Sequence, residues 1–351
     1  MNYDEAFKAA KARFDSIAKP LDGLGYFEDI ICRIAAIQQK EIPDISNKAL
    51  VIMIADNGVT AEKVTQTSSS VTAAVAGLMA EGKSTVGMML REQMVDIIPV
   101  DIGIDSDQKI DGLLDMKVKK STGNIVKEPA MTDDECIKAI CAGMKIAKDL
   151  ALKKTGIIAT GEMGIGNTTT STALFCALTG FKTEDIVGRG AGLTDEGLLR
   201  KTDAIHRAIK YHKYDNTCYI TPSKDNAFEM LAKLGGLDIA GLVGVYTGAA
   251  MCHIPVVIDG FISAVAALAA QYICPGVVNN MIASHAGKEK GTAKALELLG
   301  LRPVIDADMA LGEGTGAVLL FPMLDMVLSL YRQGVSFDDA GVSSYKRFEE
   351  C

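Results

Sequence analysis

The sequence predicts an α/β protein built on a doubly wound parallel sheet. Three observations lead to this prediction. Short apolar runs with the pattern of buried strands alternate with helical patterns along the chain. Residues 49–55 (ALVIMIA) are apolar without interruption, as expected for a central parallel strand that is covered on both faces. The predicted strands end in polar or glycine-rich turns, and open α/β sheets bind their ligands at these ends.

The predicted elements follow a regular order. Residues 1–18 have apolar side chains at helical spacing, and residues 19–25 (KPLDGLG) break this helix before a second one begins near Phe27. Strands are predicted at residues 49–55, 95–100, 156–159, 255–258 and 301–306. Helices are predicted at residues 71–90, 133–152, 172–178, 194–212 and 261–273, and after residues 236 and 317.

No internal repeat or linker divides the chain. The first two helices have no strand between them, so we expect the chain ends to pack together. The predicted division is a large α/β domain at residues 26–330 and a small helical satellite made of residues 1–25 and 331–351.

The composition excludes several classes of function. A net charge of −8 over 351 residues argues against nucleic acid as a partner, because such proteins present a basic face. The longest apolar stretch, residues 261–273, is shorter than the roughly 20 residues of a membrane-spanning helix, so no membrane partner is expected. The first residues lack the features of a signal peptide, and a cytoplasmic protein is expected.

Cysteine and histidine usage gives no sign of a metal or cofactor. The eight cysteines include no C-x-x-C, so free thiols are expected. The four histidines show no metal-ligand spacing. We therefore predict neither a metal site nor a cofactor.

The run TGEMGIGNTTTS at residues 160–171 follows a predicted strand and precedes a predicted helix. Glycines let a backbone approach a ligand closely, and the free N–H groups of a helix N-terminus attract anions. This pattern predicts a phosphate site, in which Asn167 and the threonines Thr168, Thr169 and Thr170 suit the cap and the threonine hydroxyls donate to phosphate oxygens. The glycines at 161, 164 and 166 match neither a P-loop nor G-x-G-x-x-G. An ordinary strand–helix turn is the alternative.

Four carboxylates follow predicted strands or lie in glycine-rich turns: Asp56, Glu162, Asp259 and Glu313. No histidine or cysteine stands in a recognisable nucleophile frame, so the carboxylates indicate general acid–base chemistry. Glu313 lies between two glycines and is the candidate base. A carboxylate that only stabilises a helix N-terminus is the alternative for Glu313. The charge of Glu162 does not suit a phosphate cradle, and this residue fits better as a partner of a sugar hydroxyl or a polar ring.

Several motifs, in order along nearly the whole chain, resemble those of nicotinate-nucleotide–dimethylbenzimidazole phosphoribosyltransferases, the enzymes that activate the lower ligand of cobamides. They are GEMGIGNTTT at 161–170, GRGAGL at 188–193, VIDGF at 257–261, SH at 284–285, EKG at 289–291 and LGEGTGA at 311–317. The resemblance implies a three-layer α/β/α fold with a small helical domain from the chain ends, and a dimer. It also implies transfer of phosphoribose from nicotinate mononucleotide to an aromatic acceptor, without a metal and with inversion at the anomeric carbon.

The resemblance also assigns roles to residues. Glu313 becomes the base that takes the acceptor's proton. Nucleotide and phosphate binding falls to Glu162, Gly164, Ile165, Gly166, Asn167, Thr168, Gly188, Gly190, Lys201 and Asp259. Acceptor binding falls to Asn57, Thr67, Val75, Met163 and Leu311.

Departures from the family pattern are concentrated in the acceptor region. Asn57 replaces a histidine, Val75 replaces a Met or Gln, and residues 65–70 (TQTSSS) lack a proline and a tyrosine often found there. A related enzyme works as a heterodimer and accepts phenols. Dimethylbenzimidazole and a phenol such as p-cresol therefore both stay open as acceptors, as do a homodimer and a heterodimer with a homologous chain.

Two other classes of function are weighed against this one. A nucleotide-binding or regulatory subunit that has lost turnover is the alternative, although Glu162 and Glu313 are both retained. A nicotinamide-cofactor dehydrogenase is disfavoured because G-x-G-x-x-G is missing.

Overall fold

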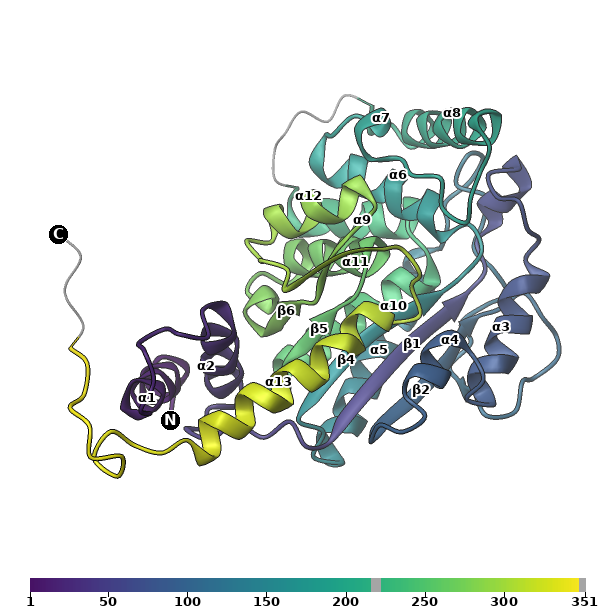
Figure 1. Cartoon of the computed structure of the whole chain (residues 1–351). Helices are drawn as coiled ribbons and strands as arrows, with labels where there is room; N and C mark the ends of the chain where they lie inside the picture. Colours follow the sequence, from purple (N-terminus) through teal and green to yellow (C-terminus); the bar gives the residue numbers. More distant parts are fainter. Residues whose placement is uncertain (216–221, 347–351) are drawn as a thin grey trace.

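The computed structural model describes residues 1–215 and 222–346 (Figure 1). Within these residues the main sheet has six strands, all paired in parallel, in the order β3-β2-β1-β4-β5-β6. The strands are β1 (Lys48–Ala55), β2 (Val95–Gly103), β3 (Leu114–Asp115), β4 (Ile157–Met163), β5 (Val256–Ile258) and β6 (Met281–Ala283). The order reverses between β1 and β4, and sheets of this kind bind ligands at the reversal.

Helices connect the strands and cover the sheet. They are α1 (Tyr3–Ser16), α2 (Tyr26–Gln38), α3 (Ser70–Ala80), α4 (Thr85–Met89), α5 (Asp133–Leu152), α6 (Asn167–Thr179), α7 (Thr183–Ile186), α8 (Asp195–Tyr211), α9 (Lys224–Leu234), α10 (Leu237–Met251), α11 (Phe261–Ile273), α12 (Lys290–Leu298) and α13 (Thr315–Gln333). Short 3-10 helices lie at η1 (Gly58–Glu62) and η2 (Val277–Asn280).

The two faces of β1 explain the layers. Val51 and Met53 belong to a core cluster with residues of α5, α6, α10 and α11. Leu50 and Ile52, which point the other way, belong to a second cluster with residues of α1, α2, α3 and α13. Strand residues alternate between faces, so a strand buried in both clusters must be apolar throughout. Figure 1 shows α13 crossing one face of the sheet, with α5 and α10 on the other.

The predicted α/β fold with a parallel sheet is confirmed, but several segments differ from expectation. Residues 71–90 form two helices, because the chain turns at Gly82 (φ +66°) and Ser84 caps α4. Helices α7 and α9 and strands β3, β6 and β7 were not predicted. The strand predicted at 301–306 does not join the main sheet: β8 (Ile305–Met309) pairs with β7 (His285–Gly287) in a separate sheet. Pro303, just before β8, has no N–H to donate to a ladder.

The two chain ends meet. Ile17 and Ser336 form an antiparallel bridge, and the Ala18 N–H donates to the Val335 carbonyl (2.8 Å). The ring centroids of Phe14 in α1 and Tyr331 in α13 are 4.8 Å apart. Figure 1 shows α1 and α2 beside the C-terminal part of α13. The predicted boundary at residue 330 cuts α13, and residues 347–351 of the predicted satellite lie outside the described residues.

Among the described residues, only helix α13 has the length and apolar composition of a membrane-spanning helix. In its most apolar window, 56% of the helix is buried inside the protein. Its buried side chains, such as Leu320 and Leu324, belong to the second core cluster. These are the properties of a core helix.

The division into a large domain and a terminal satellite stays a prediction, and Phe14→Ala tests it. Phe14 is fully buried, so we expect a loss of about 3–5 kcal/mol in the unit to which it belongs. If the chain ends form their own unit, urea denaturation should show two transitions and the substitution should shift only the weaker one. A single transition that moves as a whole would contradict the division.

Candidate functional site

The three glycine-rich turns are joined by contacts near the carboxyl edge of β4. The first turn, residues 164–166, links β4 to α6. The third, residues 311–314, leads into α13, and the Glu313 N–H donates to the Glu162 carbonyl (3.3 Å). The second, residues 188–193, precedes α8, from which Lys201 Nζ donates to Thr168 Oγ1 (2.8 Å) and to the Gly188 carbonyl (2.9 Å). The structure therefore gathers residues from all three turns.

Glu313 has an unusual backbone conformation. Its φ is +59°, between Gly312 (φ +90°) and Gly314 (φ +85°). Left-handed backbone strains a glutamate by about 1–2 kcal/mol. Glu313 is one of nine non-glycine residues with positive φ among the described residues, and it lies between two glycines that share this conformation. The half-buried carboxylate accepts a hydrogen bond from the Val86 N–H of α4 (3.0 Å). Gly161 permits this position, because a Cβ there would lie 2.6 Å from the Glu313 backbone.

Asp259 forms hydrogen bonds with the third turn and with the start of α13. Its buried carboxylate accepts hydrogen bonds from the N–H groups of Gly314 (3.1 Å), Gly316 (2.8 Å) and Ala317 (3.1 Å) at the start of α13. Burial raises the pKa of Asp259, while the neighbouring His285 opposes that rise. The anion site at this helix N-terminus is therefore already filled by a side chain of the protein. The contact of Asp259 with a nucleotide stays a prediction.

Glu162 and Asp238 form a buried pair joined by one amide. Asn167 Nδ2 donates to Glu162 Oε2 and to Asp238 Oδ2, the latter at 3.0 Å. Burial raises the pKa of Glu162 well above its usual value, and the charges of Asp238 and Asp259 raise it further. Burial also raises the pKa of Asp238 to about 6. Two acidic groups at the end of β4 and the start of α10 thus share one hydrogen-bond donor.

Lys201 supplies positive charge at the other side of α6. Its side chain is 1% exposed, and burial lowers its pKa to about 8. Glu289 counteracts that shift, and the pKa of Glu289 is itself raised by burial. A Cβ on Gly190 (φ +52°) would lie 3.1 Å from Thr168 Oγ1, so this turn lies directly against the start of α6. Gly188, Gly190, Thr168 and Lys201 thus lie together, and their contact with a nucleotide stays a prediction.

The start of α6 differs from expectation in two ways. Gly166 (φ +95°) is the N-cap and makes no side-chain bond, so Asn167 is not the cap, and its amide is committed to the two carboxylates. The Thr168 hydroxyl accepts from Lys201. A Cβ on Gly164 would lie 2.1 Å from the Ala55 carbonyl, so this glycine is required by packing on β1 before any ligand is considered.

The predicted acceptor residues are more scattered. Asn57 is 1% exposed, and its Oδ1 accepts from Thr170 Oγ1 (3.2 Å) while its Nδ2 lies 3.5 Å from the Ile165 carbonyl. Met163 and Val75 are half-buried and pack against the second core cluster. Thr67 and Leu311 are exposed. The structure therefore places Asn57 behind the first turn and not on an open surface.

Sequence reasoning missed Asp238 and Glu289. Asp238 follows Gly235 and Gly236 at the start of a helix, which looks like a carboxylate that merely favours the helix dipole. Glu289 stands in the motif EKG, but nothing local indicates that it lies beside Gly188 and Lys201. The sequence signal that could have identified Asp238 and Glu289 as site residues is a carboxylate close to glycines.

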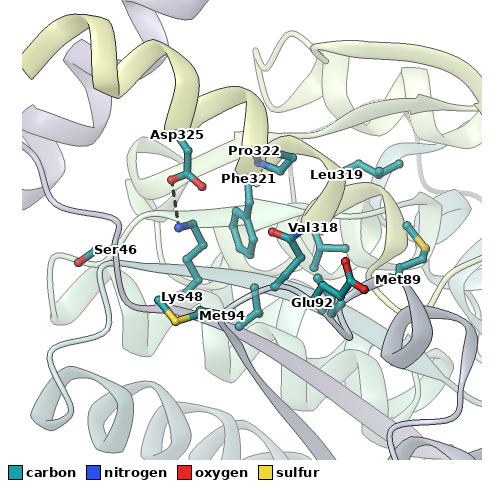
Figure 2. A pocket seen from close by; sticks show the side chains of 13 residues that line it. Ser46, Lys48, Met89, Glu92, Met94, Val318, Leu319, Phe321, Pro322 and Asp325 are labelled. Carbon is teal, nitrogen blue, oxygen red and sulfur yellow. Dashed lines mark ion pairs between the residues drawn. The ribbon is translucent and has the colours of Figure 1, made fainter. Parts of the chain in front are cut away.

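A cavity of about 380 Å³ lies elsewhere, beneath α13 (Figure 2). Lys48 and Val95, at the amino ends of β1 and β2, line it together with Val318 and Phe321. Lys48 Nζ and Asp325 Oδ1 form an ion pair across it (3.0 Å). Of the described residues around this cavity, none is a predicted catalytic or binding residue. The hydrogen-bonded turns, and not this cavity, define the candidate site.

Comparison with known proteins gives the family. A family profile described as phosphoribosyltransferase matches residues 2–342. Nicotinate-nucleotide–dimethylbenzimidazole phosphoribosyltransferase of Acetivibrio thermocellus is 43% identical over 344 residues, which cover 98% of this chain and 96% of the relative. The chain belongs to the nicotinate-nucleotide–dimethylbenzimidazole phosphoribosyltransferase family.

Other members support the assignment. The protein of the same name from Clostridium acetobutylicum is 41% identical, and the match covers 95% of this chain and 93% of that protein. The crystal structure of CobT from Thermus thermophilus matches with a TM-score of 0.89 and 35% identity, over 97% of this chain and 99% of that one. As a member of this family, the chain is a phosphoribosyltransferase, and the resemblance found in the sequence is confirmed.

Burial of Lys201 predicts a pH-dependent contribution to stability. Its pKa is about 8 in the folded protein and 10.5 in the reference state, so between these values the unfolded chain binds more protons. The free energy of unfolding of the native protein should therefore rise with pH in this window relative to Lys201→Met, by at most about 1.4 kcal/mol per pH unit. Urea unfolding from pH 7 to 10 measures it.

The matched control is Lys210→Met, on an exposed position of the same helix. The native protein and this control should change in parallel with pH. Parallel curves for Lys201→Met as well would show that Lys201 titrates normally.

Proposed function

We propose that the chain transfers phosphoribose from nicotinate mononucleotide to dimethylbenzimidazole, releasing nicotinate and giving an α-ribotide for cobamide synthesis. The observation that carries the proposal is the position of Glu313. It stands in strained backbone in the turn before α13, with its N–H bonded to the Glu162 carbonyl of β4, in a chain that matches its family over nearly its whole length. The substrates are those printed in the names of the relatives.

The chemistry requires one base and little else. A ring nitrogen of the acceptor attacks the anomeric carbon of the donor, and the bond from that carbon to the nicotinate nitrogen breaks. Nicotinate leaves as a neutral pyridine nitrogen, so its departure needs no proton. The acceptor's N–H proton passes to the Glu313 carboxylate, since the ribosylated ring would otherwise carry a positive charge. Positioning and general base catalysis are then the main contributions of the protein.

The donor's phosphate has a site of matching charge. Lys201, the Gly188 turn and the start of α6 lie together, and a helix N-terminus and an ammonium group both attract phosphate. With phosphate held there, the ribose and the nicotinate ring would extend toward Glu162 and the third turn.

A regulatory subunit without turnover is the alternative. Such a subunit would need the nucleotide contacts but not a strained glutamate beside them. The left-handed conformation of Glu313 and the glycines that permit it favour an active enzyme.

Glu313→Gln tests the base. We expect turnover to fall by about 10²-fold or more, the usual contribution of a positioned general base, with nearly unchanged affinity for nicotinate mononucleotide. Release of nicotinate in the presence of dimethylbenzimidazole measures turnover, and calorimetry measures affinity. The matched control is Glu92→Gln, an exposed carboxylate of the cavity in Figure 2, which should retain full activity. An active Glu313→Gln protein would remove Glu313 from the base role.

A phenol is the second candidate acceptor. The departures at Thr67 and Val75 remain candidate determinants, because Thr67 is exposed and Val75 is half-buried on α3. Asn57 is a weaker determinant than its sequence suggested, since its amide is buried and hydrogen-bonded to Thr170. A phenol hydroxyl, with a pKa of about 10, also needs a base such as Glu313 before it can attack.

A competition assay decides between the acceptors. Equal p-cresol and dimethylbenzimidazole are offered to the chain alone and to the chain mixed with a homologous partner chain. We expect phenol products to appear, and to increase with the partner, because smaller side chains at 67 and 75 would hold a small ring loosely without it. Exclusive use of dimethylbenzimidazole in both samples would contradict phenol acceptance and leave the main proposal intact.

A further inference from the structure

We propose that Asp238 is a positioning residue of this site. It fixes the side-chain amide of Asn167, which in turn holds Glu162 beside the turn that carries Glu313. The kinetic test of this inference rests on the proposed function, whereas its structural test does not.

Both oxygens of Asp238 are engaged. The side chain is fully buried, its Oδ1 accepts from the Ile239 N–H (3.0 Å), and its Oδ2 accepts from Asn167 Nδ2 (3.0 Å). Gly236 leaves the space that this arrangement needs, because a Cβ there would lie 2.3 Å from Asp238 Oδ1. These two hydrogen bonds therefore fix the position of the Asp238 carboxylate at the start of α10.

Asp238 selects one orientation of the Asn167 amide. An amide nitrogen carries two hydrogens, and here one points to Glu162 Oε2 and the other to Asp238 Oδ2. The reversed amide would place its oxygen against two carboxylate oxygens. Asn167 also cannot turn toward a ligand without leaving a buried carboxylate unpaired, which is costly.

Glu162 connects the oriented Asn167 amide to the third turn, which carries Glu313. While Oε2 is held by Asn167, Oε1 faces the third turn, and a Cβ on Gly312 would lie 2.9 Å from it. The Glu162 carbonyl accepts the Glu313 N–H (3.3 Å). A path of direct contacts thus runs from Asp238 through Asn167 and Glu162 to the backbone of Glu313.

An ordinary helix carboxylate explains these contacts less well. The N-cap of α10 is Gly236, and Asp238 serves its own helix through the N–H groups of Ile239 and of Asp238 itself. Its second oxygen reaches α6, from which it is separated by 71 residues of sequence. A carboxylate that only complements the helix dipole would not require this partner.

Asp238→Asn tests the inference. An asparagine can accept at its one oxygen only, so either the Ile239 N–H or the Asn167 amide loses its acceptor. We expect kcat to fall about tenfold to a hundredfold, the effect of losing a hydrogen bond to a charged group, with KM for nicotinate mononucleotide changed by less than about threefold. Asp101→Asn is the matched control, since Asp101 is a buried carboxylate at the end of β2 that contacts Ile104 and Lys117. The control should keep kcat within about threefold of the native value.

A double-mutant cycle separates positioning from general stability. If Asp238 acts through Asn167, then Asp238→Asn should cost less than about threefold in kcat when Asn167→Ala is already present. Losses that multiply, or an equal loss in Asp101→Asn, would overturn the inference.

A measurement without turnover keeps the inference distinct from the proposed function. The carboxyl ¹³C signal of Glu162 should move in Asp238→Asn and stay in place in Asp101→Asn. An unmoved signal in Asp238→Asn would refute the path through Asn167. A native protein that releases no nicotinate, with the signal moved as expected, would refute the proposed function alone.

Discussion

The structure depends on the buried carboxylate of Asp259. A carboxylate taken out of water is costly unless hydrogen bonds and positive potential replace its hydration. The start of α13 provides both, through three N–H groups and the helix dipole. Since Asp259 directly follows β5, this contact fixes the N-terminus of α13 to the carboxyl edge of the sheet. Glu313 immediately precedes that N-terminus, so the position of the catalytic candidate follows from the position of Asp259.

Charge is distributed unevenly around this anchor. Burial and the charges of Asp238 and Asp259 raise the pKa of Glu162 at the end of β4, while Lys201 lies beyond the start of α6. Nicotinate mononucleotide has a positive pyridinium ring and a negative phosphate, so the proposed donor matches both regions when it lies across α6. As the bond to nicotinate breaks, positive charge moves from the ring to the ribose carbon. That positive charge would favour the ionised form of Glu162 against the raised pKa of this group, and the carboxylate would then stabilise the transition state more than the separated product.

Much of this could be predicted from local sequence patterns. An unbroken apolar run defines β1 because both faces of that strand are buried. Glycines on both sides of Glu313 indicated a special backbone, and the structure has three successive residues with positive φ there. Local patterns failed where the surrounding structure decides where a helix ends or which strand pairs with which. The chain turns at Gly82 within a predicted helix, and β8 pairs with β7 in a sheet of its own and not with the main sheet.

The roles of single polar side chains were harder to predict, for a physical reason. A sequence shows that Asn167 begins a helix, but its amide is directed by two carboxylates 5 residues before it and 71 residues after it. Asp259 could be recognised as a carboxylate after a strand, yet its partners lie 55 to 58 residues away. Gly164 resembles a ligand-facing glycine, although the Ala55 carbonyl already excludes a side chain there. In each case the local pattern predicted that the residue belongs near the site, and long-range packing decided which atoms it touches. Residues whose side-chain partners are local, such as the Asn2 and Glu5 capping box of α1, are the ones whose contacts sequence patterns can specify best.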